Sequence, residues 1–287
     1  MPLRRRNWFI SGVRLRAAIA AVLAALTIAA VADAPVRPQS AQASAPLVIP
    51  LAQETQPPEP VRIVDPGGIG EAMHWARRRA GTVGFAVAEG KRIRGINLDH
   101  QFYSASVVKA MLALAVVRSA PKRALSSTER ALLRPMITYS DNDAASATYA
   151  RVGSEPLHRI ARAAGMTHFE IGYNWADALI TAHDQARLFQ RIDRLAPKRH
   201  RKYLRSLLAG IVPSQRWGIA PVAEERGFEI MFKGGWRPGI FHQVALLERD
   251  GKRISLAVLT SGTDHSYGRE TQSGIASRVL AKRPRRR

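Results

Sequence analysis

Cysteine is absent from the 287 residues of the sequence. Its absence excludes disulfide bonds, a thiolate nucleophile, cysteine-based zinc sites and the lipid-bearing cysteine of a lipoprotein. The eight histidines are scattered and form neither His-x-His nor His-Glu-x-x-His, so we expect no metal site and no cofactor. A chain of this length can bury a sizeable apolar core, and it needs neither a disulfide nor a metal to fold.

Acidic residues are scarce, with 22 Asp and Glu against 44 Lys and Arg and a formal net charge of +22. Such an excess of positive charge favours anionic partners, for example an acidic cell-wall polymer. The alternative is a basic surface that is simply solvated and has no partner. The basic residues do not alternate with aromatic residues along the chain, and the sequence has no zinc-finger or RNA-recognition motif. We therefore expect no nucleic-acid partner.

A run of small and apolar residues covers positions 17–32 and directly follows a basic segment. Its 16 residues are short for a membrane-spanning helix, which needs roughly 20. The small residues around 30–34 suit cleavage by a signal peptidase. We interpret residues 1–34 as a signal peptide, with an uncleaved N-terminal anchor as the alternative. Both interpretations predict an extracytoplasmic protein that is secreted, periplasmic or associated with the cell wall.

The chain after this signal divides into three parts. Residues 35–62 are rich in Pro, Ala and Gln, which is typical of an extended linker. Residues 63–281 are predicted to form one folded domain, and residues 282–287 form a basic tail.

Apolar periodicity and turn residues predict an α/β content for this domain. The predicted strands cover residues 82–89, 92–98, 229–233, 240–248 and 253–260. The predicted helices cover residues 71–80, 107–117, 127–149, 157–164, 182–193, 198–209 and 271–282. Since the first two strands form a hairpin and the last three lie near the C-terminus, we expect an antiparallel sheet formed from both ends of the chain.

The first candidate motif is Ser106-Val107-Val108-Lys109. Residues three apart on a helix share a face, and the helix that follows is apolar almost all round. A lysine in such surroundings has a lowered pKa, which lets its amine serve as a base for a neighbouring hydroxyl. The motif alone is weak, because Ser119 to Lys122 repeats it in a segment that contains a proline.

Two further motifs follow along the chain. Ser140-Asp141-Asn142 offers a hydroxyl and an amide, although the same residue types also form polar turns and helix caps. Lys233-Gly234-Gly235-Trp236 ends a predicted strand, where glycines allow a ligand or another backbone to approach closely. An ordinary turn between strands is the alternative for this segment.

The order and context of the three motifs resemble the signatures of class A β-lactamases and penicillin-binding proteins. The resemblance extends from about residue 69 to residue 281 and implies a β-lactamase/transpeptidase-like fold with an all-helical subdomain. Residues 180–184, which lead into a predicted helix, are also similar to that family's exit from its Ω-loop.

The resemblance implies a role for each matching residue. Ser106 would be the nucleophile, Lys109 would help to take its proton, and Ser140 with Lys233 would relay a proton to the leaving nitrogen. Backbone N–H groups of Ser106 and Trp236 would stabilise the oxyanion. Further substrate contacts would come from Asn142, Gly234, Gly235 and Trp236, with Arg237 and His242 as candidates near the substrate carboxylate.

Three departures from the family pattern affect this expectation. A glycine, Gly234, replaces the hydroxyl residue that normally follows Lys233, so recognition of a carboxylate should be weaker or different. Only 34 residues separate Ser106 from Ser140, which implies that a helical insert beside the cleft is missing. The family's deacylating glutamate has no clear counterpart, since Glu170 lacks the expected neighbours. Tyr173 and Trp175 are interpreted as packing residues of the same loop.

The sequence therefore predicts an exported serine hydrolase that β-lactams acylate at Ser106 and that hydrolyses the β-lactam amide slowly. A D-alanyl-D-alanine carboxypeptidase or other peptidoglycan peptidase is one alternative. A non-catalytic cell-wall-binding protein on the same fold is another. The expected partner is a β-lactam or a peptidoglycan stem peptide, and a membrane would be involved only if residues 1–34 stay attached.

Overall fold

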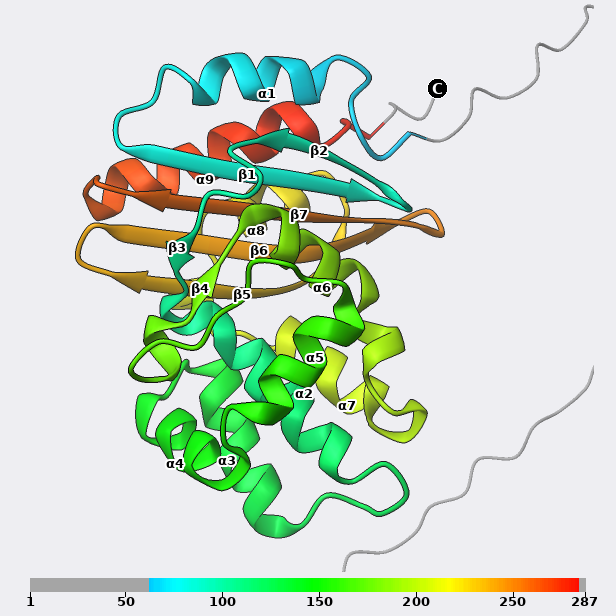
Figure 1. Cartoon of the computed structure of the whole chain (residues 1–287). Coiled ribbons are helices and arrows are strands. Elements are labelled where there is room, and N and C mark those ends of the chain that lie inside the picture. The colour runs from blue at the N-terminus through cyan, green and yellow to red at the C-terminus, as the bar shows by residue number, and fades with distance from the viewer. Residues whose placement is uncertain (1–61, 284–287) are drawn as a thin grey trace, which may run out of the picture. The chain divides into compact units, whose positions relative to one another are not determined.

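The computed structural model describes residues 62–283 (Figure 1). The expected signal peptide, residues 35–61 of the linker and residues 284–287 lie outside the described residues. None of the helices within residues 62–283 is long and apolar enough to cross a membrane.

A five-stranded antiparallel sheet forms the centre of the domain, with the strand order β2-β1-β7-β6-β5. β1 pairs with β7 along its length, for example with Phe85 opposite Val258. This pairing joins the N-terminal hairpin to the three C-terminal strands, so the prediction of a sheet built from both ends of the chain is confirmed. The strands are β1 (Thr82–Glu89), β2 (Arg92–Ile96), β5 (Glu229–Arg237), β6 (Ile240–Arg249) and β7 (Lys252–Ser261).

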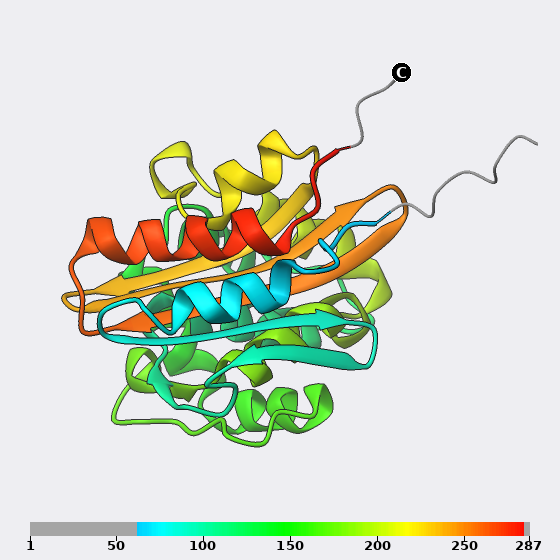
Figure 2. The ribbon, with the colours of Figure 1, turned by 90° about the horizontal axis from the view of Figure 1, so that it is seen from above.

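One face of the sheet is covered by helices from both ends of the domain. Figure 2 shows α1 (Gly68–Ala76) and α9 (His265–Val279) lying side by side across it, with α8 (Ile219–Glu225) next to α9. Phe85, Phe232 and Val258 point to this side and form a buried core with the apolar residues of these helices. Burial of apolar surface on this scale is the main stabilising contribution to such a layer.

The opposite face carries the all-helical subdomain, which Figure 1 shows below the sheet. At its centre α2 (Lys109–Ser119) is buried at every position from Lys109 to Val117, as expected for a helix that is apolar all round. The surrounding helices are α3 (Ser127–Thr138), α4 (Asn142–Val152), α5 (Glu155–Ala164), α6 (Ala182–Leu195) and α7 (Lys198–Ala209).

Short elements complete the domain and were not predicted from the sequence. A small second sheet pairs β3 (Phe102–Tyr103) with β4 (Leu179–Ile180). Short 3-10 helices occur at η1 (Ala105–Val108), η2 (Trp175–Asp177) and η3 (Pro213–Gln215). Segments of two to four residues carry too little periodicity to be identified from sequence.

The prediction of one helix over residues 127–149 was wrong, because the chain breaks between α3 and α4. Ser140 has a φ of +59°, a left-handed conformation that no helix interior accommodates. The side chain of Asp141 then caps α4 by accepting a hydrogen bond of 2.7 Å from the backbone N–H of Ala144. The break turns the backbone at Ser140 and separates the two helices.

The first and last predicted helices are displaced from the observed ones. α1 begins at Gly68 rather than at residue 71 and ends at Ala76, while α9 begins at His265 rather than at residue 271. Asp264 fixes the start of α9, since its carboxylate accepts a hydrogen bond from the backbone N–H of Tyr267. The ends of the other predicted elements differ from the structure by a few residues at most.

Candidate active site

Ser106 lies in η1, directly before α2. The backbone N–H of Lys109 donates to the carbonyl oxygen of Ser106, and side chains three residues apart eclipse each other in such a turn. Ser106 is half-buried, and its hydroxyl has no hydrogen-bond partner among residues 62–283. The preceding residue, Ala105, has a φ of +45°, which is strained for a residue with a side chain. The hydroxyl is therefore held at a sharp turn and is free to meet a ligand.

Lys109 is fully buried, and polar groups from the α3–α4 break surround its ammonium. Its Nζ donates to the carbonyl oxygen of Ser140 at 2.6 Å and to Oδ1 of Asn142 at 2.7 Å. Burial lowers the pKa of Lys109 to about 8, although the nearby carboxylate of Asp141 acts in the opposite direction. At pH 7 roughly a tenth of this amine is thus unprotonated, far more than of an ordinary lysine, and a general base requires this neutral form.

Lys233 is the second buried ammonium, and it comes from the edge strand β5. Its Nζ donates to Oγ of Ser140 at 3.0 Å and to the carbonyl oxygen of Gly234 at 2.8 Å. Burial lowers the pKa of Lys233 well below its ordinary value, and the charge of Lys109 lowers it further. Lys109 also reaches Oγ of Ser140, at 3.3 Å. The Ser140 hydroxyl therefore links the two amines.

Gly235 brings β5 against the turn that carries Ser106. A Cβ at this position would lie 2.8 Å from the carbonyl oxygen of Ser104 and 2.9 Å from the backbone nitrogen of Ser106. Both are backbone atoms that cannot move aside, so the strand approaches this closely only because the residue is glycine. The close packing fixes the distance between the end of β5 and the candidate nucleophile.

An aromatic group lies beside Gly234, where the resemblance predicts a hydroxyl residue. A Cβ on Gly234 would be 3.5 Å from ring carbons of Trp217. The ring of Trp217 also makes an edge-to-face contact with Trp236, at 5.8 Å between centroids. The surroundings of Gly234 are consequently aromatic, and the resemblance predicts a hydroxyl at this position that the chain does not supply.

Trp175 closes the site around Lys109, a contact that the sequence did not indicate. Its ring centroid lies 4.8 Å from Nζ of Lys109, within the range of a cation–π interaction. The indole N–H donates to Oγ of Ser146 at 3.1 Å, and the side chain is 8% exposed. Trp175 is thus a packing residue of the loop, as predicted, and its packing partner is the candidate base. The same prediction for Tyr173 was wrong, because that side chain is fully exposed.

Glu170 lies on the surface of the same loop, and within the described part of the chain its carboxylate makes no hydrogen bond or ion pair with Ser106 or Lys109. Its carboxylate accepts a hydrogen bond from Gln101 at 3.1 Å, and its backbone pairs with Leu179. The structure therefore places no glutamate from this loop in contact with the lysine amine.

Arg237 and His242 occupy different surroundings, although both come from the β5–β6 hairpin. Arg237 forms an ion pair of 2.8 Å with Asp177 and lies over the ring of Tyr103. His242 is fully buried, with Nε2 donating to the carbonyl oxygen of Tyr103 and Nδ1 accepting from the backbone N–H of Thr260. Burial lowers the pKa of His242 to about 4. Both ring nitrogens are therefore occupied, and neither is available to a substrate carboxylate.

The arrangement combines a free hydroxyl, two buried amines with lowered pKa values and a bridging hydroxyl. Such a set can remove a proton from a serine and deliver it elsewhere without a histidine. Within residues 62–283 no group of three or more His, Asp or Glu side chains is placed to hold a metal ion.

Comparisons with known proteins identify a matching sequence family and a shared fold. The sequence model described as "Beta-lactamase enzyme family" matches residues 127–282, which is more than half of the chain and includes Ser140 and Lys233. Ser106 and Lys109 precede the matched segment. No curated protein matches the sequence.

Solved structures show the same fold at low sequence identity. A β-lactamase from Sphaerobacter thermophilus DSM 20745 is 21% identical with a TM-score of 0.66, and the match covers 75% of this chain and 96% of that one. TLA-3 extended-spectrum β-lactamase is 15% identical with a TM-score of 0.65, covering 74% and 96%. PBP-A is 16% identical with a TM-score of 0.64, covering 74% and 94%. The fold is therefore β-lactamase/transpeptidase-like.

Proposed function

Because the chain belongs to the beta-lactamase enzyme family, we propose that it is a serine hydrolase that β-lactams acylate at Ser106. One observation carries this proposal: the buried amines of Lys109 and Lys233 both donate to the hydroxyl of Ser140, while Lys109 directly follows the turn that holds Ser106. A purely structural role would not require two lysines in one buried network, because burying charge is costly.

Acylation begins at the Ser106 hydroxyl. Its oxygen attacks the carbonyl carbon of the lactam amide while the unprotonated amine of Lys109 takes its proton. The carbon–nitrogen bond of the lactam then breaks, and the leaving nitrogen receives a proton from the Ser140 hydroxyl. Lys233 or Lys109 returns a proton to Ser140, since both amines are hydrogen-bonded to it. The product is an ester on Ser106.

The backbone around Gly235 supports the transition state in this proposal. The N–H groups of Ser106 and Trp236 donate to the oxyanion that develops during attack, where preorganised donors have their largest effect. The amide of Asn142 and the backbone of Gly235 and Trp236 bind the substrate's amide chain. Asn142 can do so because only its Oδ1 is engaged, by Lys109, and its side chain is exposed.

Slow hydrolysis of the ester follows from the surroundings of Lys109. Water needs a base next to the ester carbonyl, and the loop offers the indole of Trp175 at that amine rather than a carboxylate. Glu170 is engaged by Gln101 on the surface. We therefore expect the acyl-enzyme to accumulate.

A peptidoglycan peptidase, such as a D-alanyl-D-alanine carboxypeptidase, is the second candidate. The loop that carries Trp175 brings no carboxylate to Lys109, which favours this candidate, because β-lactams then act as slowly released inhibitors. It shares acylation of Ser106 with the first candidate and differs in which substrate turns over.

A fluorescent penicillin tests the proposal. The wild-type protein should become covalently labelled, and Ser106→Ala should abolish labelling. Ser119→Ala is the matched control, since Ser119 begins the second Ser-x-x-Lys sequence and only donates to the carbonyl oxygen of Val116. A folded wild-type protein that stays unlabelled would favour a non-catalytic cell-wall-binding protein instead.

Turnover distinguishes the two enzymatic candidates. Release of D-alanine from a stem peptide, with nitrocefin hydrolysed only slowly, would identify the peptidase. Multiple turnovers of nitrocefin without release of D-alanine would identify the β-lactamase.

Residues 1–34 support the further proposal that the protein is exported and acts outside the cytoplasm. Export predicts that an expressed full-length protein is recovered in the extracytoplasmic fraction, while a variant lacking residues 1–34 stays in the cytoplasm. Equal distribution of both proteins would contradict export.

The positive net charge supports a second proposal, that the protein is attracted to an anionic cell-wall polymer. Binding of the protein to isolated cell walls should then weaken as salt is added.

A further inference from the structure

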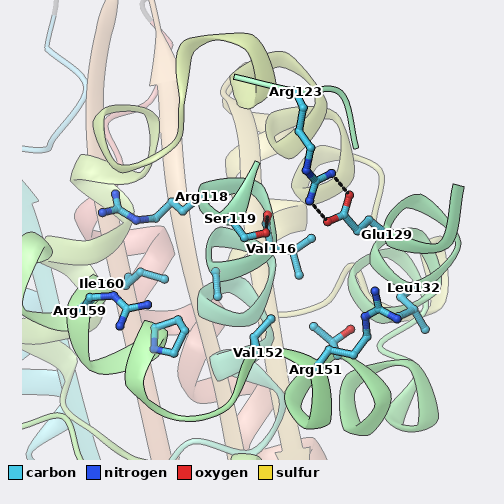
Figure 3. A pocket seen from close by; sticks show the side chains of 13 residues that line it. Val116, Arg118, Ser119, Arg123, Glu129, Leu132, Arg151, Val152, Arg159 and Ile160 are labelled. Atoms are coloured by element: carbon cyan, nitrogen blue, oxygen red, sulfur yellow. Dashed lines mark hydrogen bonds and ion pairs between the residues drawn. The ribbon is translucent and has the colours of Figure 1, made fainter. Parts of the chain in front are cut away.

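A cavity of about 640 Å³ lies within the helical subdomain, between the C-terminal half of α2 and the helices α3, α4 and α5. Its volume falls in the range of small-molecule sites. None of the candidate catalytic or substrate-binding residues lines it. Figure 3 shows the side chains of these helices directed around the space.

The inner wall of the cavity is apolar. Ala115, Val116 and Ile160 are buried there, while Leu132 and Val152 are half-buried. The half-buried Leu132 and Val152 still expose apolar surface, and covering that surface with an apolar group lowers the free energy. The wall therefore suits the hydrocarbon or aromatic part of a ligand.

The mouth of the cavity is strongly basic. Four arginines line it against one carboxylate, that of Glu129, and the arginines are exposed. Glu129 is neutralised by Arg123, which pairs with both of its carboxylate oxygens (Figure 3). The lining arginines are Arg118, Arg123, Arg151 and Arg159.

Two of these guanidinium groups are available to an anion. Arg151 has no hydrogen-bond or ion-pair partner in the described part of the chain. Arg159 makes only a surface pair of 3.5 Å with Glu155 on its own helix, and such exposed pairs are weak. Arginine is suited to carboxylates because its planar guanidinium offers several donors in a fixed geometry.

We propose that this cavity binds a small amphiphilic carboxylate, with its apolar body against α2, α4 and α5 and its anionic head at Arg151 and Arg159. The apolar wall and the basic mouth are complementary to the two parts of such a molecule. The site is separate from the Ser106 cleft and does not depend on the reaction proposed there.

Titration calorimetry with decanoate, below the concentration at which it forms micelles, tests the proposal on the folded protein. Decanoate should bind saturably with one site. Decan-1-ol should bind more weakly, because it has the same chain without the charge, and decyltrimethylammonium should not bind. Equal affinity for decanoate and decanol, or no saturable binding of decanoate, would overturn the proposal.

Variants locate the site. Val152→Trp should fill the apolar wall and abolish binding, and the combination of Arg151→Gln with Arg159→Gln should weaken it about tenfold, as loss of charge-assisted hydrogen bonds does. Arg134→Gln is the matched control, because Arg134 is an exposed arginine of α3 outside the cavity lining. Circular dichroism confirms that each variant is folded. Unchanged binding in folded Val152→Trp, or an equal loss in Arg134→Gln, would contradict the assignment.

Discussion

The pH dependence of acylation gives a direct test of Lys109 as the base. Burial lowers the pKa of Lys109 from 10.5 to about 8, a shift equivalent to about 3 kcal/mol in favour of the neutral amine. If the neutral amine takes the proton of Ser106, the acylation rate should rise about tenfold per pH unit below pH 8 and level off above it.

Asp141→Asn sharpens this test. The carboxylate of Asp141 raises the pKa of Lys109, so its removal should lower that pKa and move the midpoint of the profile to a more acidic value. Because Asp141 is exposed, the movement should be modest, as expected for a solvent-screened charge pair worth no more than about 1 kcal/mol. Asparagine also caps helices well, so the start of α4 at Asp141 should be preserved.

The assay is stopped-flow or quenched labelling with a penicillin over the range from about pH 6 to 10. The penicillin is kept at a saturating concentration, so that the measured rate is that of acylation and not of binding. Wild type and Asp141→Asn should reach the same plateau at high pH and differ only in midpoint. A flat profile below pH 8 would refute Lys109 as the base. A midpoint that moves to higher pH in Asp141→Asn would refute the electrostatic reasoning.

Three further predictions follow from packing and charge. Gly235→Ala should lower the free energy of unfolding, measured by urea titration, by about 1–3 kcal/mol and should slow acylation, because its Cβ would collide with backbone at Ser106. Gly70→Ala on α1 is the control: its Cβ would have nothing within 4 Å, so the free energy of unfolding should rise by about 0.5–1 kcal/mol. Stability should fall as pH drops from 6.5 towards 4, by up to about 3 kcal/mol, because the unfolded state protonates His242 before the folded state does; His242→Gln should lose that share of the pH dependence, and an identical profile would contradict it. A double-mutant cycle of Arg237→Gln and Asp177→Asn should give a coupling below about 1 kcal/mol in thermal unfolding, since the pair is partly exposed, and a much larger coupling would disprove a surface role.

The sequence predicts the framework of the fold because its signals are local. The hairpin of β1 and β2 and the apolar helix α2 follow from residue patterns within each segment. Burial of Lys109 also follows, because the lysine stands in a helix that has no polar face. The pairing of β1 with β7 follows from the order of predicted elements rather than from any single segment.

The break at Ser140 shows where local patterns conflict. The residues around Ser140 favour a helix, while Ser140-Asp141-Asn142 favours a helix cap. The sequence left two alternatives for this motif, a structural cap and a site for chemistry, and in the structure the two are compatible. Asp141 caps α4, and the left-handed turn at Ser140 directs its carbonyl oxygen and hydroxyl to Lys109. A structural cap and a candidate proton relay thus occupy adjacent residues.

The remaining contacts of the site depend on tertiary packing alone. Trp175 reaches Lys109 from a loop with no periodicity, and Asp177 of the same loop pairs with Arg237 on β5. His242 was expected near a substrate carboxylate, yet β6 is buried continuously around it, and its ring is bonded to the carbonyl oxygen of Tyr103. No spacing in the sequence specifies such pairs, because each joins segments whose approach is set by the whole fold.

Intact-mass spectrometry after exposure to a penicillin, followed over time, tests the central claim most directly. We expect the protein to gain the mass of one penicillin, with the adduct located on the peptide that contains Ser106, and to keep it long after free penicillin is removed. A folded protein that gains no mass, or an adduct on another residue, would contradict acylation at Ser106. An adduct that disappears as fast as it forms would contradict slow hydrolysis.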